Sequence, residues 1–326
     1  MPLRQRIIMK SSSFFAYEQI SSAGETSFRA ALIRAQLRWL VRPLLSHRTA
    51  VKWQRRLVGS LRWTVPIPQG IQTDLLELGG RSTDRHTPGH ESHSKDSAET
   101  PILYFHGGGY TLCSPNSHRG LTRLIARETG MTVYVPTYRL APEHPFPAQL
   151  HDAEAVLRDL ERQGTDVRKL VFAGDSTGAH LAFTLALSRR ELGLPMPRAL
   201  VLISPCVDWT LKGLPSSDDD ALLSKAWVTW ARDGYVSENM QTHPMVTPSK
   251  EDLTGLPPIL IQSASREIFA EEARRLHRAL HDSDVLVRWQ EWHGMWHDFH
   301  LHATLVPEAY DAVRRIARFI KEDINE

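Results

Sequence analysis

The sequence predicts an α/β fold, in which a mostly parallel sheet carries helices on both faces. Short apolar runs alternate with longer amphipathic stretches, as buried strands alternate with helices in such folds. One serine, Ser176, lies between glycines where an apolar run at 170–173 meets a helical run at 179–183. The 326 residues, 41% of them hydrophobic, suffice for one large domain with a helical cap.

The first sixty residues differ from the rest in charge, because eleven Lys and Arg residues stand there against two acidic residues. Residues 28–40 have helical spacing with arginines on one side. We therefore expect residues 1–60 to form an N-terminal helical cap. An organelle-targeting peptide and a helix lying on a membrane surface are the alternatives.

The main domain is expected to span residues 61–326. Its strands are predicted near 61–66, 72–78, 102–105, 132–136, 169–173, 199–203, 258–262 and 285–290. Its helices are predicted near 116–129, 148–162, 177–190, 269–281 and 307–321. Residues 80–100 are polar and punctuated by Gly and Pro, so we expect an exposed loop there, without metal-ligand spacing among its histidines. Residues 208–248 interrupt the alternation and are expected to complete the cap.

The segment at 174–178 reads Gly-Asp-Ser-Thr-Gly and predicts a nucleophile. A serine on a tight strand-to-helix turn is held in a strained, exposed conformation, and the N-terminus of the helix lies near the oxyanion that forms during attack. Without that chemistry, the pentapeptide would be a plain glycine-rich turn. Its place between a strand and a helix favours the nucleophile, and Ser176 is the candidate.

A second motif, His-Gly-Gly-Gly-Tyr at 106–110, directly follows the predicted strand at 102–105. Consecutive glycines adopt backbone angles that are closed to other residues, so their N–H groups can point at one oxygen. The motif therefore predicts an oxyanion hole. A phosphate-binding loop is the alternative, but neither Gly-Lys-Ser/Thr nor a spaced Gly-x-Gly-x-x-Gly supports nucleotide binding here.

A catalytic serine needs a general base and a carboxylate, which follow it in the chain if the order is nucleophile, acid, histidine. Four histidines follow the last predicted strand: His293, His297, His300 and His302. His297 is the first choice as base because it lies in a loop just past that strand. Glu267 is the first choice as acid, because it follows the end of the strand at 258–262 and can orient the imidazole.

A third stretch, at 138–148, reads Tyr-Arg-Leu-Ala-Pro-Glu-His-Pro-Phe-Pro-Ala. With these three motifs in this order, the chain resembles the hormone-sensitive-lipase-like family of α/β-hydrolases, which carries the His-Gly-Gly-Gly motif. The resemblance covers residues 60–322 and extends to Asp152, the Ser-Pro at 204–205 with Asp208, and the Leu-Pro-Pro at 256–258. It implies the α/β-hydrolase fold, with N-terminal helices that roof the active site.

The resemblance also implies a role for each matching residue. Ser176 would be the nucleophile and His297 the base. The oxyanion hole would consist of the backbone N–H groups of Gly107, Gly108 and Thr177. The Arg139 and Glu143 side chains would be structural and would fix a turn below the active site.

The chain departs from the family pattern at two places. The family acid is usually Asp where this chain has Glu267, and Gly-Asp-Ser-Ala-Gly-Gly reads Gly-Asp-Ser-Thr-Gly-Ala here. Glutamate is one methylene longer but can accept the same imidazole hydrogen bond. Asp208 is the main rival, because it follows the strand at 199–203, and Glu271 and Glu272 are further rivals one helical turn on.

Together these residues predict a serine hydrolase that needs neither metal nor cofactor and cleaves carboxylic esters of small to medium hydrophobic substrates through an acyl-enzyme. Aromatic residues near the chemistry are the candidates for the substrate pocket: Tyr110, Trp209 and Trp296. Hydrolysis of amides, formamides or thioesters, and acyl transfer, would use the same residues. The alternative from another class is a non-catalytic small-molecule-binding protein, against which the presence of both Ser176 and His297 argues.

Composition narrows the partners. A formal charge of +2 without a nucleic-acid motif argues against nucleic acid. Two cysteines, Cys113 and Cys206, give no disulfide framework and fit a reducing, cytoplasmic location. No apolar run approaches membrane-spanning length, so membrane contact would involve the basic N-terminus. The sequence does not distinguish a monomer from a homodimer.

Overall fold

The structure is a computed structural model that describes residues 16–20, 26–61, 65–89, 100–215, 219–322 and 324. Its strands are β1 (Ala16–Ile20), β2 (Ile71–Leu78), β3 (Arg81–Pro88), β4 (Ile102–Phe105), β5 (Val133–Pro136), β6 (Val171–Asp175), β7 (Ala199–Ile203), β8 (Ile259–Ala264) and β9 (Val287–Trp292). They form one sheet in the order β1-β9-β8-β7-β6-β4-β5-β3-β2. Strand β3 is antiparallel to its neighbours β2 and β5, and the other pairs are parallel.

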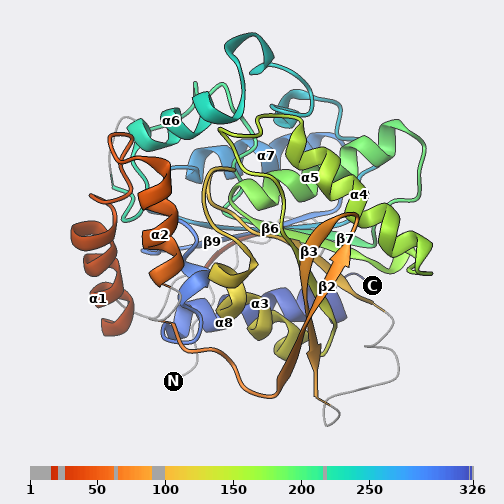
Figure 1. Cartoon of the computed structure of the whole chain (residues 1–326), viewed down its shortest axis with the longest axis horizontal. Helices are drawn as coiled ribbons and strands as arrows, with labels where there is room; N and C mark the ends of the chain where they lie inside the picture. The colour runs from red at the N-terminus through yellow and green to blue at the C-terminus, as the bar shows by residue number, and fades with distance from the viewer. Residues whose placement is uncertain are drawn as a thin grey trace.

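The helices cover both faces of this sheet. They are α1 (Phe28–Gln36), α2 (Val51–Leu61), α3 (Pro115–Thr129), α4 (Ala148–Arg162), α5 (Thr177–Glu191), α6 (Lys225–Tyr235), α7 (Ala270–Asp282) and α8 (Pro307–Lys321). A π-helical segment, η1 (Leu37–Val41), continues α1, and a 3-10 turn, η8 (Phe299–His302), precedes α8. Helices α4, α5 and α7 lie on one face, and α3 and α8 on the other (Figure 1), each with its own hydrophobic core. No described helix is long and apolar enough to cross a bilayer.

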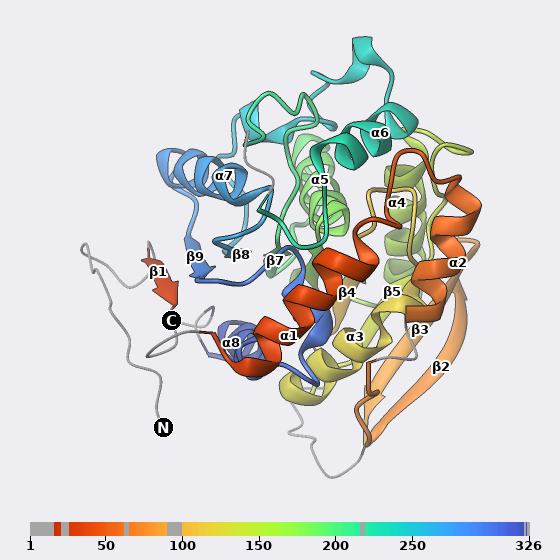
Figure 2. The same cartoon turned by 90° about the vertical axis from the view of Figure 1, so that its left-hand side faces the viewer.

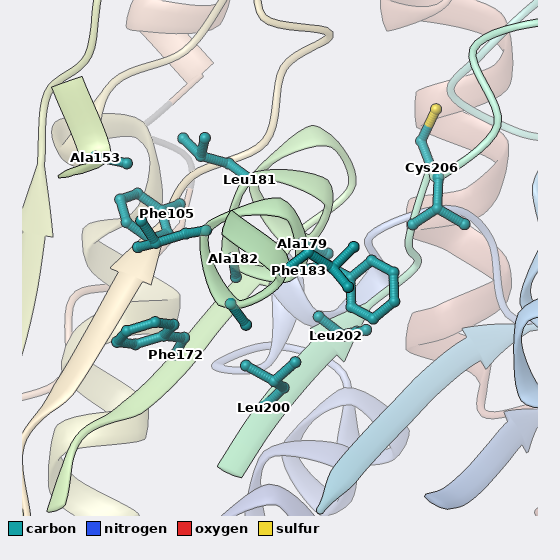
Figure 3. Close-up of a cluster of buried hydrophobic side chains, with 14 of the residues drawn as sticks. Phe105, Ala153, Phe172, Ala179, Leu181, Ala182, Phe183, Leu200, Leu202 and Cys206 are labelled. Carbon is teal, nitrogen blue, oxygen red and sulfur yellow. The ribbon is translucent and has the colours of Figure 1, made fainter. Parts of the chain in front are cut away.

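Helix α5 lies at the centre of the first core and carries the turn that bears Ser176. Its Ala179, Ala182 and Phe183 pack over Phe172 of β6 and Leu202 of β7 (Figure 3). These side chains are fully buried. Because burying a Phe or Leu side chain stabilises a fold by about 1.5–3 kcal/mol, this packing fixes the start of α5 against the sheet.

The predicted alternation of strands and helices is confirmed. Seven of the predicted strands coincide with β2 and β4 to β9 within two residues at each end. The five predicted helices coincide with α3, α4, α5, α7 and α8 within one residue. The helix expected at 28–40 corresponds to α1 and η1.

The loop predicted at 80–100 is wrong where residues 81–88 form β3, and most of the remainder lies outside the described residues. A Gly-Gly turn at 79–80 joins β2 to β3, and both glycines have the positive φ that a tight hairpin turn needs. The polar side chains of β3 have partners, since Asp84 accepts two hydrogen bonds from Arg119 of α3. The polarity of residues 81–88 therefore suggested a loop, whereas the Gly-Gly pair before them was the better signal and indicated a β-hairpin turn.

Two further elements at the start of the chain differ from expectation. The strand predicted at 61–66 is wrong at its described positions, because Leu61 ends α2 and residues 65–66 belong to no strand; residues 62–64 lie outside the described residues. Prolines at 66 and 68 cannot donate to a strand ladder. Strand β1 was not predicted, and it pairs in parallel with β9 at the edge of the sheet.

The described N-terminal helices α1 and α2 lie on the same side of the molecule (Figures 1 and 2). Arg55 of α2 donates to both carboxylate oxygens of Glu143 and to two nearby backbone carbonyl groups. Arg139 forms hydrogen bonds with both carboxylate oxygens of Asp152 at the start of α4. Glu143 thus holds α2 against the turn at 141–143, and Arg139 holds the segment after β5.

Candidate active site

Ser176 stands at the head of α5, directly after β6, with φ 52° and ψ −118°. A positive φ is strained for a residue with a side chain, and such strain is typical of functional turns. The Ser176 N–H donates to the Ile203 carbonyl at 2.8 Å. A Cβ on Gly178 would collide with the Phe105 carbonyl oxygen, so a glycine is required for α5 to approach β4 this closely.

His297 reaches Ser176 from the loop between β9 and η8. Its Nε2 lies 3.0 Å from Ser176 Oγ, which is a hydrogen-bond distance. Both residues are almost fully buried, and the ring of Phe269 packs edge-on against the imidazole. The structure therefore brings together the two residues that the sequence nominated as nucleophile and base, although 121 positions separate them.

Glu267 lies on the other side of the imidazole. Its Oε2 is 3.4 Å from His297 Nδ1, and neither of these two atoms has a hydrogen-bond partner among the described residues. Asp208 instead accepts a hydrogen bond from Thr210, and Glu272 accepts the backbone N–H of Asp208. Of the carboxylates proposed as acid, Glu267 is therefore the one that lies at the imidazole. Asp208 and Glu272 form hydrogen bonds with residues of the segment after β7.

No hydrogen bond joins the remaining candidates of the C-terminal third to Ser176 in the described part of the chain, although His302 lines the same cavity as Ser176. Glu271 forms a surface ion pair with Arg274. His293 is exposed, His302 packs against Trp296, and the Nε2 of His300 lies 2.8 Å from Gln262 Oε1.

Asp298 is a second carboxylate at the imidazole. Its Oδ2 lies 3.1 Å from His297 Nε2, the atom that faces Ser176. Burial alone would lower the pKa of His297, but the carboxylates of Asp298 and Glu267 outweigh it and raise that pKa well above its ordinary value. Burial also raises the pKa of Asp298 to about 7.

The glycine motif lies beside Ser176, but its first glycine is already engaged. The N–H of Gly107 donates to Asp175 Oδ2 at 3.0 Å, which argues against Gly107 as an oxyanion donor. Gly108 and Gly109 have φ of 113° and 64°, and both line the same cavity as Ser176. Among the described residues, no acceptor takes the N–H groups of Gly108, Gly109 and Thr177.

Asp175, the residue before the nucleophile, is the centre of a buried polar network. Its Oδ1 accepts the Tyr104 hydroxyl at 2.6 Å, and its Oδ2 lies 3.0 Å from His118 Nε2. Burial would raise the pKa of Asp175, but His118 outweighs it and lowers that pKa. Burial would lower the pKa of His118, but Asp175 outweighs it and raises that pKa. The resulting ion pair holds Gly107, and with it the glycine loop, next to Ser176.

A cavity of about 630 Å³ opens onto Ser176 and His297. Much of its wall is aliphatic and comes from the N-terminal segment: Leu37, Leu40, Val41, Leu44, Leu57 and Val58. The segment after β7 adds Leu222, Leu223 and Trp227. Both segments that were expected to form a cap therefore line this cavity. We call their cavity-lining residues the roof.

The structure does not support the three aromatic pocket candidates, since none of them contributes to the cavity as the described residues define it. Tyr110 is fully buried, its hydroxyl lies 2.7 Å from His180 Nδ1, and its ring stacks with Trp209. Trp296 packs edge-on against Phe299 in the opposite core. Tyr110 and Trp296 are adjacent in sequence to the site residues, so their backbone lies near the active site. Their side chains pack into the hydrophobic cores and do not line the cavity.

Sequence reasoning missed several polar residues around the site. Asp175 and Asp298 adjoin the nucleophile and the base in the chain, and that adjacency was an available signal. His118 gave no such signal. Asp220 accepts the backbone N–H of Ile268 and two backbone N–H groups of the roof, so it ties the loop that bears Glu267 to the cavity wall.

Comparisons with known proteins agree with this fold. Residues 102–301 match a family model described as the α/β-hydrolase fold. The chain is 37% identical to an acetyl-hydrolase of Streptomyces hygroscopicus over 69% of this chain and 76% of that protein. It is 36% identical to an esterase of Acinetobacter venetianus over 71% of this chain and 78% of that protein. A solved esterase of the bacterial hormone-sensitive lipase family superposes with a TM-score of 0.85 at 29% identity, covering 92% of this chain and 100% of the other. The chain therefore belongs to the α/β-hydrolase family, in the hormone-sensitive-lipase-like group that its three motifs indicated.

Proposed function

We propose that the protein is a serine esterase that cleaves carboxylic esters of small to medium hydrophobic substrates through an acyl-enzyme. The observation that carries the proposal is the 3.0 Å contact between Ser176 Oγ and His297 Nε2, inside a cavity of about 630 Å³ with largely aliphatic walls. The relatives named above are esterases and acetyl-hydrolases, which supports the same reaction.

In the proposed mechanism, Ser176 Oγ attacks the ester carbonyl carbon while His297 Nε2 takes the hydroxyl proton. Glu267 orients the imidazole through Nδ1 and stabilises its charged form. The tetrahedral intermediate then collapses, the bond to the alcohol oxygen breaks, and the leaving alcohol takes the proton from Nε2. Water then attacks the acyl-serine carbonyl carbon while His297 Nε2 takes its proton. The bond between that carbon and Ser176 Oγ breaks, Oγ takes the proton back from Nε2, and the acid is released.

We assign the oxyanion hole to the backbone N–H groups of Gly108, Gly109 and Thr177. Support comes from their place beside Ser176 and from the lack of a competing acceptor among the described residues. The Thr177 N–H lies in the first turn of α5, where the helix dipole favours negative charge. A single donor of this kind stabilises the transition state by about 2.7–4 kcal/mol.

We also propose that residues 1–60 and 208–248 act together as a cap over the cavity. Both contribute side chains to its wall. They are joined directly, since Trp227 Nε1 of α6 donates to Gln54 Oε1 of α2 at 2.8 Å. The cap thus encloses the acyl or alcohol group while the sheet supplies the chemistry.

Replacing the nucleophile is the experiment that tests this function. Ser176→Ala should lower the kcat for p-nitrophenyl butyrate by about 10³–10⁶-fold and abolish labelling by a fluorophosphonate probe, with circular dichroism unchanged. Ser188→Ala is the matched control, because Ser188 lies on the same helix and bonds Glu154 away from the cavity.

Two outcomes would contradict the proposal. One is a Ser176→Ala variant that still reacts with the probe. The other is a wild-type protein that hydrolyses no p-nitrophenyl ester from acetate to dodecanoate. The same protein assayed with a p-nitroanilide and a thioester shows whether esters are the preferred class.

A further inference from the structure

The N-terminal cap exposes an apolar face to solvent. Six of the eleven large hydrophobic side chains that are exposed among the described residues fall within residues 28–53. They are Phe28 (82% exposed), Leu32 (48%), Trp39 (74%), Leu40 (64%), Leu44 (50%) and Trp53 (54%), and we call them the α1–α2 face. Concentrated exposure of this kind is typical of an interaction surface and not of scattered surface residues.

Helical spacing shows why this face points outward. Phe28, Leu32 and Trp39 are separated by four and seven positions, so they follow one stripe of the α1 and η1 helix. Ala30 and Leu37 follow the opposite, buried stripe. A helix with apolar stripes on two sides buries only one of them in this chain, which leaves the other for a partner.

Basic residues surround this apolar face. Residues 26–61 contain eight Lys and Arg and no Asp or Glu, in a chain whose net charge is +2. Arg48, Lys52 and Arg56 are exposed, and no carboxylate among the described residues pairs with them. The Arg56 guanidinium lies 4.8 Å above the Trp53 ring, so cation and aromatic ring occupy the same patch.

The α1–α2 face is continuous with the mouth of the cavity. Leu40 and Leu44 are exposed to solvent and also line the cavity that contains Ser176. Ile67, 42% exposed, lines the same opening. Figure 2 shows α1 crossing the face of the molecule that is turned to the viewer, with α2 beside it.

We propose that the α1–α2 face binds the surface of an anionic lipid bilayer, so that the cavity mouth opens toward the membrane interface. Tryptophan with flanking Arg and Lys is the composition that partitions into lipid headgroups, where the rings lie in the interface and the cations contact anionic headgroups. Delivery of a membrane-borne ester to Ser176 rests in addition on the proposed esterase function, whereas binding to the bilayer does not.

Charge is what favours a lipid surface over a second copy of this chain. Two copies that meet through this face would oppose Arg48, Lys52 and Arg56 of one to those of the other, without carboxylates in residues 26–61 to offset the repulsion. An anionic bilayer supplies the missing negative charge over the whole face.

Co-sedimentation of the full chain with vesicles tests the proposal. We expect binding to phosphatidylglycerol vesicles that is at least about tenfold tighter than to phosphatidylcholine vesicles at 50 mM salt and that weakens at 500 mM. Arg48→Gln/Lys52→Gln/Arg56→Gln should weaken binding to phosphatidylglycerol about 100-fold, at about fivefold for each cation. Trp39→Gln/Trp53→Gln should weaken it at least about tenfold.

Matched controls change the same residue types elsewhere. Arg127→Gln/Arg158→Gln/Arg162→Gln removes three exposed arginines from α3 and α4, and Leu75→Gln/Leu192→Gln removes two exposed leucines. Both controls should bind vesicles like the wild type. None of the variants changes a cavity or catalytic residue, so hydrolysis of soluble p-nitrophenyl butyrate should stay within about twofold of the wild type.

The outcomes separate this inference from the proposed function. Ser176→Ala should bind vesicles like the wild type while losing hydrolysis. Failure of the wild type to bind phosphatidylglycerol, or unchanged binding by the tryptophan or the charge variant, overturns the lipid surface and leaves the esterase intact. A dimer in sedimentation velocity that becomes monomeric in Trp39→Gln/Trp53→Gln, without vesicle binding, would assign the face to a second copy.

Discussion

The floor and the roof of the cavity are built on opposite principles. The floor carries charged and polar groups that are buried and paired: Asp175 with His118, and His297 with Ser176, Glu267 and Asp298. The roof is aliphatic on its inner side and largely apolar and basic on its outer side. Buried polar groups tolerate little displacement because each lost hydrogen bond leaves a desolvated partner, whereas an aliphatic wall tolerates changes of shape. We therefore expect catalysis to depend on the floor and substrate choice to depend on the roof.

The largest effect should come from the carboxylate of the floor. Glu267→Gln keeps the shape of the side chain but removes the charge that stabilises the imidazolium, so kcat should fall about 10⁴-fold with the fold preserved. Glu267→Asp should lower kcat without abolishing it, because the shorter side chain withdraws from His297 Nδ1. Steady-state kinetics with p-nitrophenyl butyrate measure both.

Asp208→Asn is the matched control for that prediction. Asp208 bonds Thr210 and does not contact the imidazole, so this variant should lose activity only mildly or act through stability. If Asp208→Asn were inactive and Glu267→Gln nearly normal, the assignment of the acid would be wrong.

The comparison of floor and roof also explains what the sequence could predict. Ser176 and His297 were predictable because a strand-to-helix turn and a loop after a strand fix where their backbone lies. The alternation of strands and helices was predictable from the hydrophobic pattern, whereas β1 and β3 were not predicted. The sequence could nominate Glu267 as the acid but could not exclude Asp208, because Asp208 also follows the end of a strand of the same sheet.

The cavity wall was not predictable, since it depends on side-chain direction across distant segments. Tyr110 adjoins the oxyanion glycines in sequence, yet it packs into an aromatic cluster under α6. Much of the wall is instead formed by aliphatic residues of the N-terminal segment, and Leu37 among them is separated from Ser176 by more than a hundred positions. Only the packed tertiary structure brings the roof over the serine.

A moderate effect should come from narrowing the roof. Leu37 is 7% exposed and points into the cavity, so Leu37→Trp should fill space that a longer acyl chain needs. We expect kcat/KM for p-nitrophenyl octanoate to fall about tenfold relative to acetate, as removal of room for one or two methylenes would do.

Leu32→Trp is the control for the roof, because Leu32 lies on the outer stripe of the same helix. It should leave the ratio of octanoate to acetate unchanged. Overpacking at Leu37 could lower stability by about 1–3 kcal/mol, so the melting temperature of both variants is measured alongside. Equal loss on acetate and octanoate would show that this wall does not select chain length.

The smallest effect should be a displacement of the pH profile by Asp298→Asn. Activity requires neutral His297, so kcat/KM falls as pH decreases through the pKa of His297 in the free enzyme. Burial lowers that pKa, but the carboxylates, Asp298 first among them, raise it well above its ordinary value. An uncharged Asn removes the largest raising contribution, so the pKa should fall and the acid limb of the kcat/KM profile should move to lower pH. The variant should then keep a larger fraction of its maximal activity near pH 6 than the wild type does. Glu271→Gln, which neutralises an exposed carboxylate on α7, should leave the profile in place. An acid limb that stays or moves to higher pH in Asp298→Asn would show that Asp298 does not set the proton affinity of the base.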